Sequence, residues 1–154
     1  MNLIETGVKD VVAHQSVKIM MPSNIYACEL EKEVFVGPFV EIQKGVRIGE
    51  RTKIQSHSFI CELVKIGQDC FIGHGVVFIN DTFAKGAPAD GDQSLWKNTV
   101  VGDHVSIGSN ATILPVSICD HVVIGAGAVV TKNIENAGIY AGNPARKIRD
   151  FKKK

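Results

Sequence analysis

The stretch Leu30–Phe83 reads LEKEVFVGPFVEIQKGVRIGERTKIQSHSFICELVKIGQDCFIGHGVVFINDTF and repeats every six residues without a gap. The first position of each six is large and apolar: Leu30, Val36, Ile42, Ile48, Ile54, Ile60, Ile66, Ile72 and Phe78. The fifth position is mostly small or β-branched: Val34, Val40, Val46, Thr52, Ser58, Val64, Cys70, Val76 and Thr82. An apolar period of six matches neither a helix nor an alternating strand, but it is a signature of β-solenoids.

One short strand and one tight turn fit into six residues. We therefore expect the first- and fifth-position side chains to point inward, and three sixes to close one triangular coil. Neighbouring coils then hydrogen-bond to each other in a quasi-one-dimensional stack. Glycine is frequent at the second position (Gly37, Gly49, Gly67 and Gly73), where we expect it to give the corner backbone freedom. The pattern predicts an all-β fold, a parallel β-helix.

The register shifts outside the strict block. Ile19 and Ile25 are six apart but one residue out of phase with the block, so we expect an opening coil that is irregular or shifted by one residue. The ladder resumes at Val101 and loses one residue between Ile113 and Ile118.

Two segments leave the repeat altogether. Ile79–Asn98 is rich in Gly, Asp, Ala and Pro, which predicts a loop, and a long loop inserted in a regular solenoid is usually functional or disordered. Trp96 in this loop either anchors it or stacks on a ligand. Residues 145–154 are expected to form a short C-terminal helix with Ile148 and Phe151 on one face.

Composition narrows the class of protein. A chain of 154 residues is most simply one domain, residues 1–154. Its 17 Lys and Arg nearly balance its 16 Asp and Glu, so no strong field draws it to nucleic acid. There is no apolar run of membrane-spanning length and no signal peptide is evident, so we expect no membrane partner and a cytoplasmic location. The four cysteines form no C-x-x-C pair and are expected to be buried free thiols, without a disulfide or metal site.

The motifs IGAGAVVTKNI at 124–134 and AGNPARKI at 141–148 stand behind this interrupted ladder. Together they resemble the left-handed β-helix acyltransferases. The block at 53–81, KIQSHSFICELVKIGQDCFIGHGVVFIND, resembles more narrowly the N-acetyltransferases of nucleotide-linked 3-amino sugars. These act on UDP-2-acetamido-3-amino-2,3-dideoxyglucuronate or dTDP-3-amino-3,6-dideoxyhexoses. The resemblance implies a left-handed β-helix, acetyl-CoA as cosubstrate, a homotrimer with active sites between subunits, and a role in surface (lipopolysaccharide) polysaccharide synthesis.

The same resemblance implies where coenzyme A lies. It places the pantetheine arm beside Gly125, Ala126, Gly127 and Ala128. It places the adenosine phosphate end near Ala141, Gly142 and Asn143, with Lys132 or Arg146. The nucleotide-linked sugar would then lie against the earlier coils and the inserted loop.

The candidate catalytic residues follow from the chemistry of acyl transfer. A sugar hydroxyl needs a general base, whereas a neutral amine attacks without one. The loop after Phe78 carries no His, which favours an amine acceptor. Asn80 is the candidate for orienting that amine, because its carbonyl accepts an N–H bond. Asp81 either assists or shapes the turn. His57 and His74 are separated by nearly one coil length, so they are expected to share one side of the prism and are either further candidates or surface residues.

Three alternatives remain open at the level of sequence. An O-acetyltransferase would use His57 or His74 as its base. A zinc hydratase of the γ-carbonic anhydrase type typically needs two His five apart plus a third, and the chain has no such pair. A trimeric scaffold without activity would need neither the small-residue stretch nor the loop. Whether the nucleotide is UDP or dTDP is left open.

Overall fold

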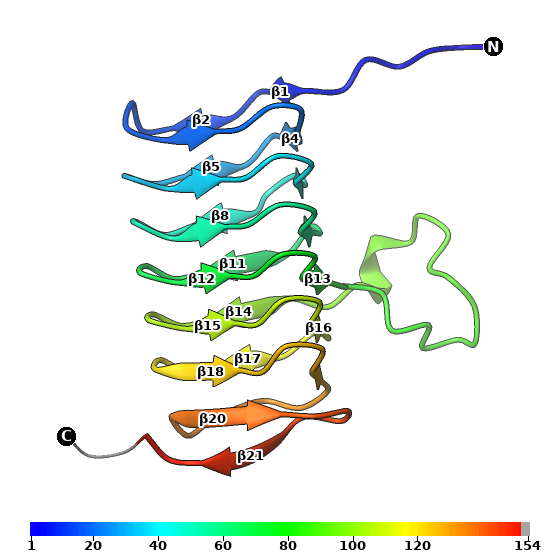
Figure 1. Cartoon of the computed structure of the whole chain (residues 1–154). Coiled ribbons are helices and arrows are strands. Elements are labelled where there is room, and N and C mark those ends of the chain that lie inside the picture. The colour runs from blue at the N-terminus through cyan, green and yellow to red at the C-terminus, as the bar shows by residue number, and fades with distance from the viewer. Residues whose placement is uncertain (152–154) are drawn as a thin grey trace.

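The computed structural model describes residues 1–151 as a stack of triangular coils, with the N-terminal residues at one end and the C-terminal hairpin at the other (Figure 1). The short strands form three sheets, one on each side of the prism, and all strand pairs are parallel except β20 with β21. Sheet A contains β1 (Val8–Lys9), β4 (Asn24–Tyr26), β7 (Glu41–Ile42), β10 (Phe59–Ile60), β13 (Val77–Phe78), β16 (Thr112–Ile113) and β19 (Val129–Val130). Sheet B contains β2 (Val12–Ala13), β5 (Glu29–Leu30), β8 (Arg47–Ile48), β11 (Val64–Ile66), β14 (Thr99–Val101) and β17 (Ser117–Ile118). Sheet C contains β3 (Lys18–Ile19), β6 (Phe35–Val36), β9 (Lys53–Ile54), β12 (Phe71–Ile72), β15 (Ser106–Ile107), β18 (Val122–Ile124), β20 (Gly138–Ala141) and β21 (Arg146–Arg149).

The chain passes through the sheets in the order A, B, C, and we name the turns between them the A–B, B–C and C–A corners. Each first-position side chain from Leu30 to Phe78 is buried, as are the fifth-position side chains from Val34 to Val76. Two buried polar members of the fifth-position column keep their hydroxyl groups satisfied. Thr52 donates to the carbonyl of Gly67, and Ser58 to that of Gly73, both at 2.8 Å. The predicted β-helix is confirmed, although Thr82 is exposed because the loop leaves the coil before it.

The role predicted for the second-position glycines was wrong. None of Gly37, Gly49, Gly67 and Gly73 has a positive φ. A Cβ on Gly73 would instead lie 2.7 Å from the carbonyl oxygen of Ile107, so the residue is small because the next coil approaches it closely. The residues with positive φ are instead those at the fourth position of each six. Most of them are not glycine; Phe39 and His57 are examples.

The expected register shifts are present. Ile25 pairs with Ile42 in the next coil, whereas Leu30 pairs with Ile48. The separation in sequence between Ile25 and Ile42 is one residue less than that between Leu30 and Ile48. The opening coil is therefore one residue short. Ile79–Asn98 leaves the stack between β13 and β14 as the predicted loop, which projects from the A–B corner and contains the single turn η1 (Gln93–Leu95) (Figure 1).

The predicted C-terminal helix was wrong. Arg146–Arg149 is the strand β21, which turns back antiparallel to β20. Pairing with the exposed edge of β20 satisfies backbone groups that one isolated helical turn would leave without partners. Ile148 and Phe151 stay 61% and 45% exposed, so they do not form the expected apolar face, and residues 152–154 of the predicted helix lie outside the described residues.

The four cysteines are free thiols, and Cys28, Cys61 and Cys70 are buried as predicted, whereas Cys119 is only half-buried. Burial raises the pKa of the Cys28 thiol to about 11 and that of Cys61 to about 12. No helical segment found in residues 1–151 has the length and apolarity to cross a membrane.

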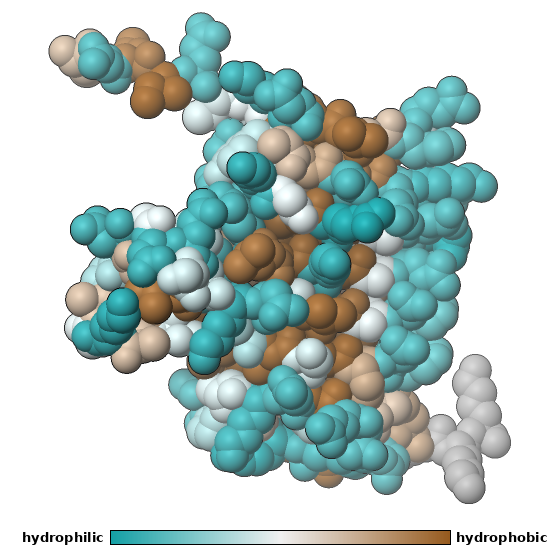
Figure 2. Space-filling view, turned by 180° about the vertical axis from the view of Figure 1, so that it is seen from behind, coloured by the Kyte–Doolittle hydropathy of each residue, from teal (hydrophilic) through white to brown (hydrophobic). Residues whose placement is uncertain are grey.

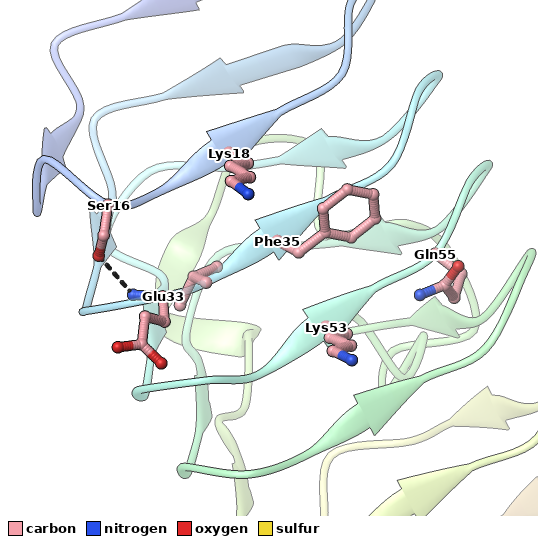
Figure 3. Close-up of a pocket in the computed structure, with 7 residues that line it drawn as sticks. Ser16, Lys18, Glu33, Phe35, Lys53 and Gln55 are labelled. Carbon is pink, nitrogen blue, oxygen red and sulfur yellow. Dashed lines mark hydrogen bonds between the residues drawn. The ribbon is translucent and has the colours of Figure 1, made fainter.

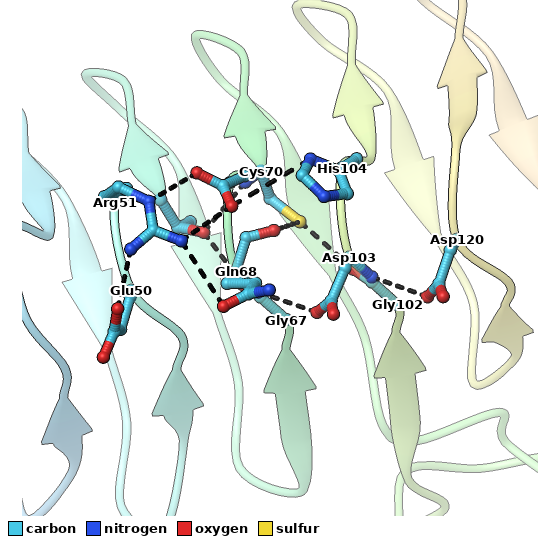
Figure 4. Close-up of polar contacts among 11 residues, drawn as sticks. Glu50, Arg51, Gly67, Gln68, Cys70, Gly102, Asp103, His104 and Asp120 are labelled. Atoms are coloured by element: carbon cyan, nitrogen blue, oxygen red, sulfur yellow. Dashed lines mark hydrogen bonds and ion pairs between the residues drawn. The ribbon is translucent and has the colours of Figure 1, made fainter.

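A column of polar side chains connects the coils along the B–C corner (Figure 4). The guanidinium group of Arg51 donates to both carboxylate oxygens of Asp69, at 2.7 and 2.8 Å, and to Glu50 at 2.6 Å. The rings of His104 and His121 stack at 4.8 Å in the later coils of the same corner. Arg51, Asp69, His104 and His121 line up because each occupies the equivalent turn position of successive coils, and Glu50 precedes Arg51 in the same turn.

We expect the protein to be less stable in acid, because protonation of Asp69 weakens its ion pair with Arg51. The hydrogen bond from Arg51 holds the pKa of Asp69 below its ordinary 3.8. Because the folded pKa is the lower one, the ion pair contributes stability above pH 3.8, and this contribution is lost as the pH falls through the folded pKa. We expect Asp69→Asn to have a lower Tm than the wild type at pH 7, by a small margin because the pair is exposed, and the same Tm in strong acid. Asparagine tolerates the positive φ of this residue, so an equal Tm difference at all pH values would show that the ion pair is not the cause.

Candidate functional site

The two candidate histidines lie at the C–A corner in successive coils. His57 lies in the turn between β9 and β10, and His74 in the turn between β12 and β13. Backbone bonds connect these turns: the amide of Gly75 donates to the carbonyl of Ser56, and the amide of Asn110 to that of His74. The expectation that both histidines share one side of the prism is therefore confirmed.

The two histidines have different surroundings. His74 Nδ1 lies 2.9 Å from Ser56 Oγ, which fixes the orientation of the ring and leaves Nε2 directed away from this contact. The ring of His57 packs on Phe39, with the ring centroids 5.0 Å apart. Sequence reasoning missed Ser56, although it precedes His74 by the length of one full coil in this part of the chain.

Asn80 and Asp81 follow β13 at the neck of the loop. The amide nitrogen Nδ2 of Asn80 donates to the carbonyl of Glu62 at 3.2 Å, and its backbone carbonyl accepts from the amide of Lys97. Its side-chain oxygen Oδ1 accepts no bond from residues 1–151 and is not a buried atom. The amide group is thus held from one side while its acceptor oxygen stays open.

Asp81 is occupied by the loop itself. Its Oδ1 accepts from the amide of Phe83 at 2.9 Å, and its Oδ2 accepts from the amide of Ala89 at 2.7 Å. Of the two roles left open for this residue, shaping the turn is the one that these contacts support. Trp96 is half-buried and lines a cavity with Leu63 below the loop.

The structure does not bring Asn80 and His74 together within one chain. They lie at opposite ends of β13, Asn80 at the A–B corner and His74 at the C–A corner. At the rise of an extended chain, the strand between them places the two side chains on the order of 15 Å apart. A single acceptor group cannot contact both side chains of the same chain.

The small-residue turn lies further along the C–A corner, in the same column as the histidines. The amide of Gly127 donates to the carbonyl of Ser109 at 2.9 Å. This bond connects the turn of Gly127 to the turn of Asn110, which is itself bonded to the turn of His74. Ala126 and Gly127 are exposed, and no atom lies within 4 Å of the position that a Cβ of Gly127 would take. The side chain of Ala128 is fully buried in the core at the fifth position, so of the four residues expected beside the pantetheine arm it is the one that points inward.

The C-terminal hairpin completes this end of the stack. A Cβ on Gly125 would lie 2.9 Å from the Cβ of Ala141, and the amide of Val129 donates to the carbonyl of Gly142. The adjoining Asn143 is exposed. The residues predicted for the two ends of coenzyme A are therefore neighbours in the last coil.

Three cations meet at a cavity of about 230 Å³ beside this hairpin. Lys132, Arg146 and Lys147 line it together with Tyr140. Lys147 is paired with Asp150 at 2.5 Å, a hydrogen bond that raises the pKa of the lysine. Lys132 follows β19 whereas Arg146 begins β21, so the hairpin is what places these two residues at one cavity. An anion such as a phosphate fits this arrangement of charges.

The search for metal sites covered the part of the chain that the structure describes. Residues 1–151 contain no group of three or more His, Cys, Asp or Glu side chains placed to hold a metal ion.

Known proteins resemble this chain in sequence and in fold. The family model described as the hexapeptide repeat of succinyl-transferase matches residues 63–79 and 98–132. A chloramphenicol acetyltransferase of Agrobacterium fabrum is 49% identical over 53 residues, which are 34% of this chain and 25% of that protein. For six of the curated relatives that it matches, the chain spans between 17% and 33% of their length.

Two solved structures share the fold over nearly the whole chain. AntD, an N-acyltransferase from Bacillus cereus in complex with dTDP and coenzyme A, aligns with a TM-score of 0.69 and 23% identity, over 95% of this chain and 83% of that one. Perosamine N-acetyltransferase from Caulobacter crescentus, in complex with CoA and GDP-perosamine, aligns with a TM-score of 0.65 and 21% identity, over 94% and 58%. At these identities the likeness establishes the fold.

Proposed function

We propose that this chain is an acyl-CoA-dependent N-acyltransferase that acetylates the amine of a nucleotide-linked sugar. The proposal rests on the contacts of Asn80. Its Nδ2 donates to the backbone carbonyl of Glu62, while its Oδ1 accepts no hydrogen bond within residues 1–151. An open amide oxygen accepts an N–H bond and orients an amine, but it is too weak a base to deprotonate a hydroxyl group.

Bound acyl-CoA supplies a thioester, whose carbonyl carbon the amine attacks and whose thiolate leaves and takes the proton. The chain itself contributes positioning. Ala126 and Gly127 leave room for a narrow arm along the C–A corner, and Lys132 and Arg146 supply positive charge for phosphate groups at its end. The neighbouring structures in complex with coenzyme A support this cosubstrate.

A homotrimer is part of the proposal, because within a single chain Asn80 lies too far from the C–A corner to share a site with it. If the A–B corner of one subunit faces the C–A corner of the next, Asn80 and His74 of different subunits border the same cleft. Both corners carry exposed apolar side chains suited to contact: Phe39 is 56% exposed and Leu63 43%. Figure 2 shows apolar surface down the body of the stack beside the projecting loop. Cyclic symmetry closes such a repeated contact.

The finer parts of the proposal are the substrate and its setting. We infer a UDP- or dTDP-linked 3-amino sugar used in surface polysaccharide synthesis. The structural neighbours in complex with dTDP or GDP-perosamine support a nucleotide substrate. The four unpaired thiols suit a reducing compartment, and we infer a cytoplasmic location.

One observation favours an O-acetyltransferase as the second candidate. The contact between His74 Nδ1 and Ser56 Oγ orients the imidazole, and an oriented imidazole is what a general base for a hydroxyl acceptor requires.

The direct test is release of free thiol from acetyl-CoA with a panel of UDP- and dTDP-linked 3-amino and 4-amino sugars. The matching hydroxyl sugars serve as controls. We expect release with a 3-amino sugar, which would also identify the nucleotide. Release with hydroxyl acceptors alone would replace this proposal by the O-acetyltransferase, and no release with any acceptor would favour a scaffold.

A further inference from the structure

A cavity of about 390 Å³ lies on the outer face of sheet C, at the N-terminal end of the stack. Its residues are polar at the edges and apolar in the middle: Ser16, Lys18, Glu33, Val34, Phe35, Lys53 and Gln55 (Figure 3). The volume falls within the range of small-ligand sites in proteins, roughly 300–1,000 Å³. Apart from Val34, a core residue at a fifth position, these side chains are explained neither by the hexapeptide pattern nor by the candidate catalytic residues.

Strand register sets an aromatic ring between two cations. Lys18 pairs with Phe35 in the neighbouring strand, and Phe35 pairs with Lys53 in the next. Strands of a sheet lie about 4.8 Å apart, so the two lysine Cα atoms are about 10 Å apart with the phenylalanine midway. Four-carbon side chains bridge that separation easily and can converge on one ligand.

Both lysines are free to bind an anion. Within residues 1–151, no carboxylate lies within 4.0 Å of either ammonium group. Glu33, the one carboxylate that lines the cavity, lies 3.7 Å from Lys32. The backbone amide of Glu33 donates to Ser16 Oγ at 2.8 Å, which ties the turns of successive coils together at this edge (Figure 3).

We propose that this cavity binds the nucleoside diphosphate portion of the substrate, with the base stacked on Phe35 and the diphosphate held between Lys18 and Lys53. An aromatic ring offers a flat apolar face to a base, and ammonium groups form charge-assisted hydrogen bonds with phosphate oxygens. A ligand that satisfies the ring and both cations at once carries a planar base and a diphosphate. This assignment rests on the function proposed above.

The position of the cavity fits the length of such a substrate. Gln55 at its edge immediately precedes Ser56 and the C–A corner. From β6, which carries Phe35, to β12, which precedes His74, is two strand spacings, about 10 Å. With the diphosphate between the two lysines, the sugar leaves the cavity on the side of Lys53, which faces the strand that precedes His74.

Calorimetric binding of UDP and dTDP tests the assignment without any acyl transfer. In Lys18→Met and Lys53→Met we expect the Kd for the preferred nucleotide to rise about tenfold or more, the usual effect of losing a charge-assisted bond. Binding of the phosphate-free nucleoside should be unchanged in both. Phe35→Leu should weaken the nucleotide and the nucleoside alike. Lys44→Met and Phe151→Leu are the matched controls, since both residues are exposed and neither lines or adjoins the cavity, and thermal unfolding checks that every variant is folded.

The possible results separate this inference from the function on which it rests. Unchanged nucleotide affinity in all three cavity variants, or no binding of either nucleotide by the wild type, would overturn the assignment. A parallel loss of coenzyme A binding would also overturn it, because the cavity would then hold the adenosine diphosphate of the cosubstrate. Lysine-dependent nucleotide binding without acyl transfer to any amino sugar would uphold the cavity and reject the transferase.

Discussion

Asn80→Ala is expected to lower kcat for acetyl transfer about a hundredfold, in the range found when one positioned polar group is removed from an active site. The variant loses the oxygen that we propose orients the attacking amine. It also loses the bond from Nδ2 to the carbonyl of Glu62, which costs about 1 kcal/mol of stability. Steady-state kinetics with the preferred amino sugar, together with the denaturation midpoint, separate the two effects.

Asn98→Ala is the matched control for this prediction. Asn98 is an exposed residue beside the neck of the same loop, and its side chain makes no hydrogen bond within residues 1–151, so its replacement should leave kcat unchanged. Turnover by Asn80→Ala at the wild-type rate would remove Asn80 from the mechanism. A loss of activity in Asn98→Ala as well would mean that the loop as a whole, rather than one amide, is responsible.

Ile107→Ala is expected to reduce the free energy of unfolding by about 2–5 kcal/mol, the range for removing a large aliphatic side chain from a core. Ile107 occupies a first position on β15 and is 1% exposed. Each coil packs only on its two neighbours, so the cavity cannot be filled from elsewhere. Urea denaturation measures the change.

Ser106→Ala, one residue earlier on the same strand, is the control for Ile107. Ser106 points outward and is only partly buried, so its replacement should change stability by less than about 0.5 kcal/mol. Equal effects of the two substitutions would contradict the division of each strand into an inward and an outward residue.

The coil stack was predictable from sequence because the same six-residue pattern occurs many times along the chain. Each first position samples the same inward geometry, so single exceptions do not obscure the pattern. The C-terminal strand β21 was not predictable in this way, since nothing in Arg146–Arg149 repeats an earlier unit. Its conformation is set by the free edge of β20, a tertiary contact that local helix propensity does not contain.

The candidate site was predictable only in part. The pattern placed His57 and His74 on one corner correctly, because their separation in sequence is close to one coil length. It did not show that Asn80 and His74 lie at opposite ends of β13, because the repeat does not give the bounds of the strand. It also missed Lys18, Phe35 and Lys53, whose regular spacing of one coil each is visible only once coil lengths are known. The side chains that we propose to be functional lie on the outer surface, where the six-residue repeat places no constraint on residue type.

The antiparallel hairpin formed by β20 and β21 also determines how the molecule behaves towards copies of itself. A parallel solenoid that simply stopped would present at each end a template on which another molecule could add, and head-to-tail addition of this kind produces open fibres rather than closed assemblies. Here the last strand runs in the reverse direction and carries Arg146, Lys147 and Arg149. The reversed direction of β21 does not match the parallel strands of another stack, so the hairpin opposes head-to-tail addition at this edge.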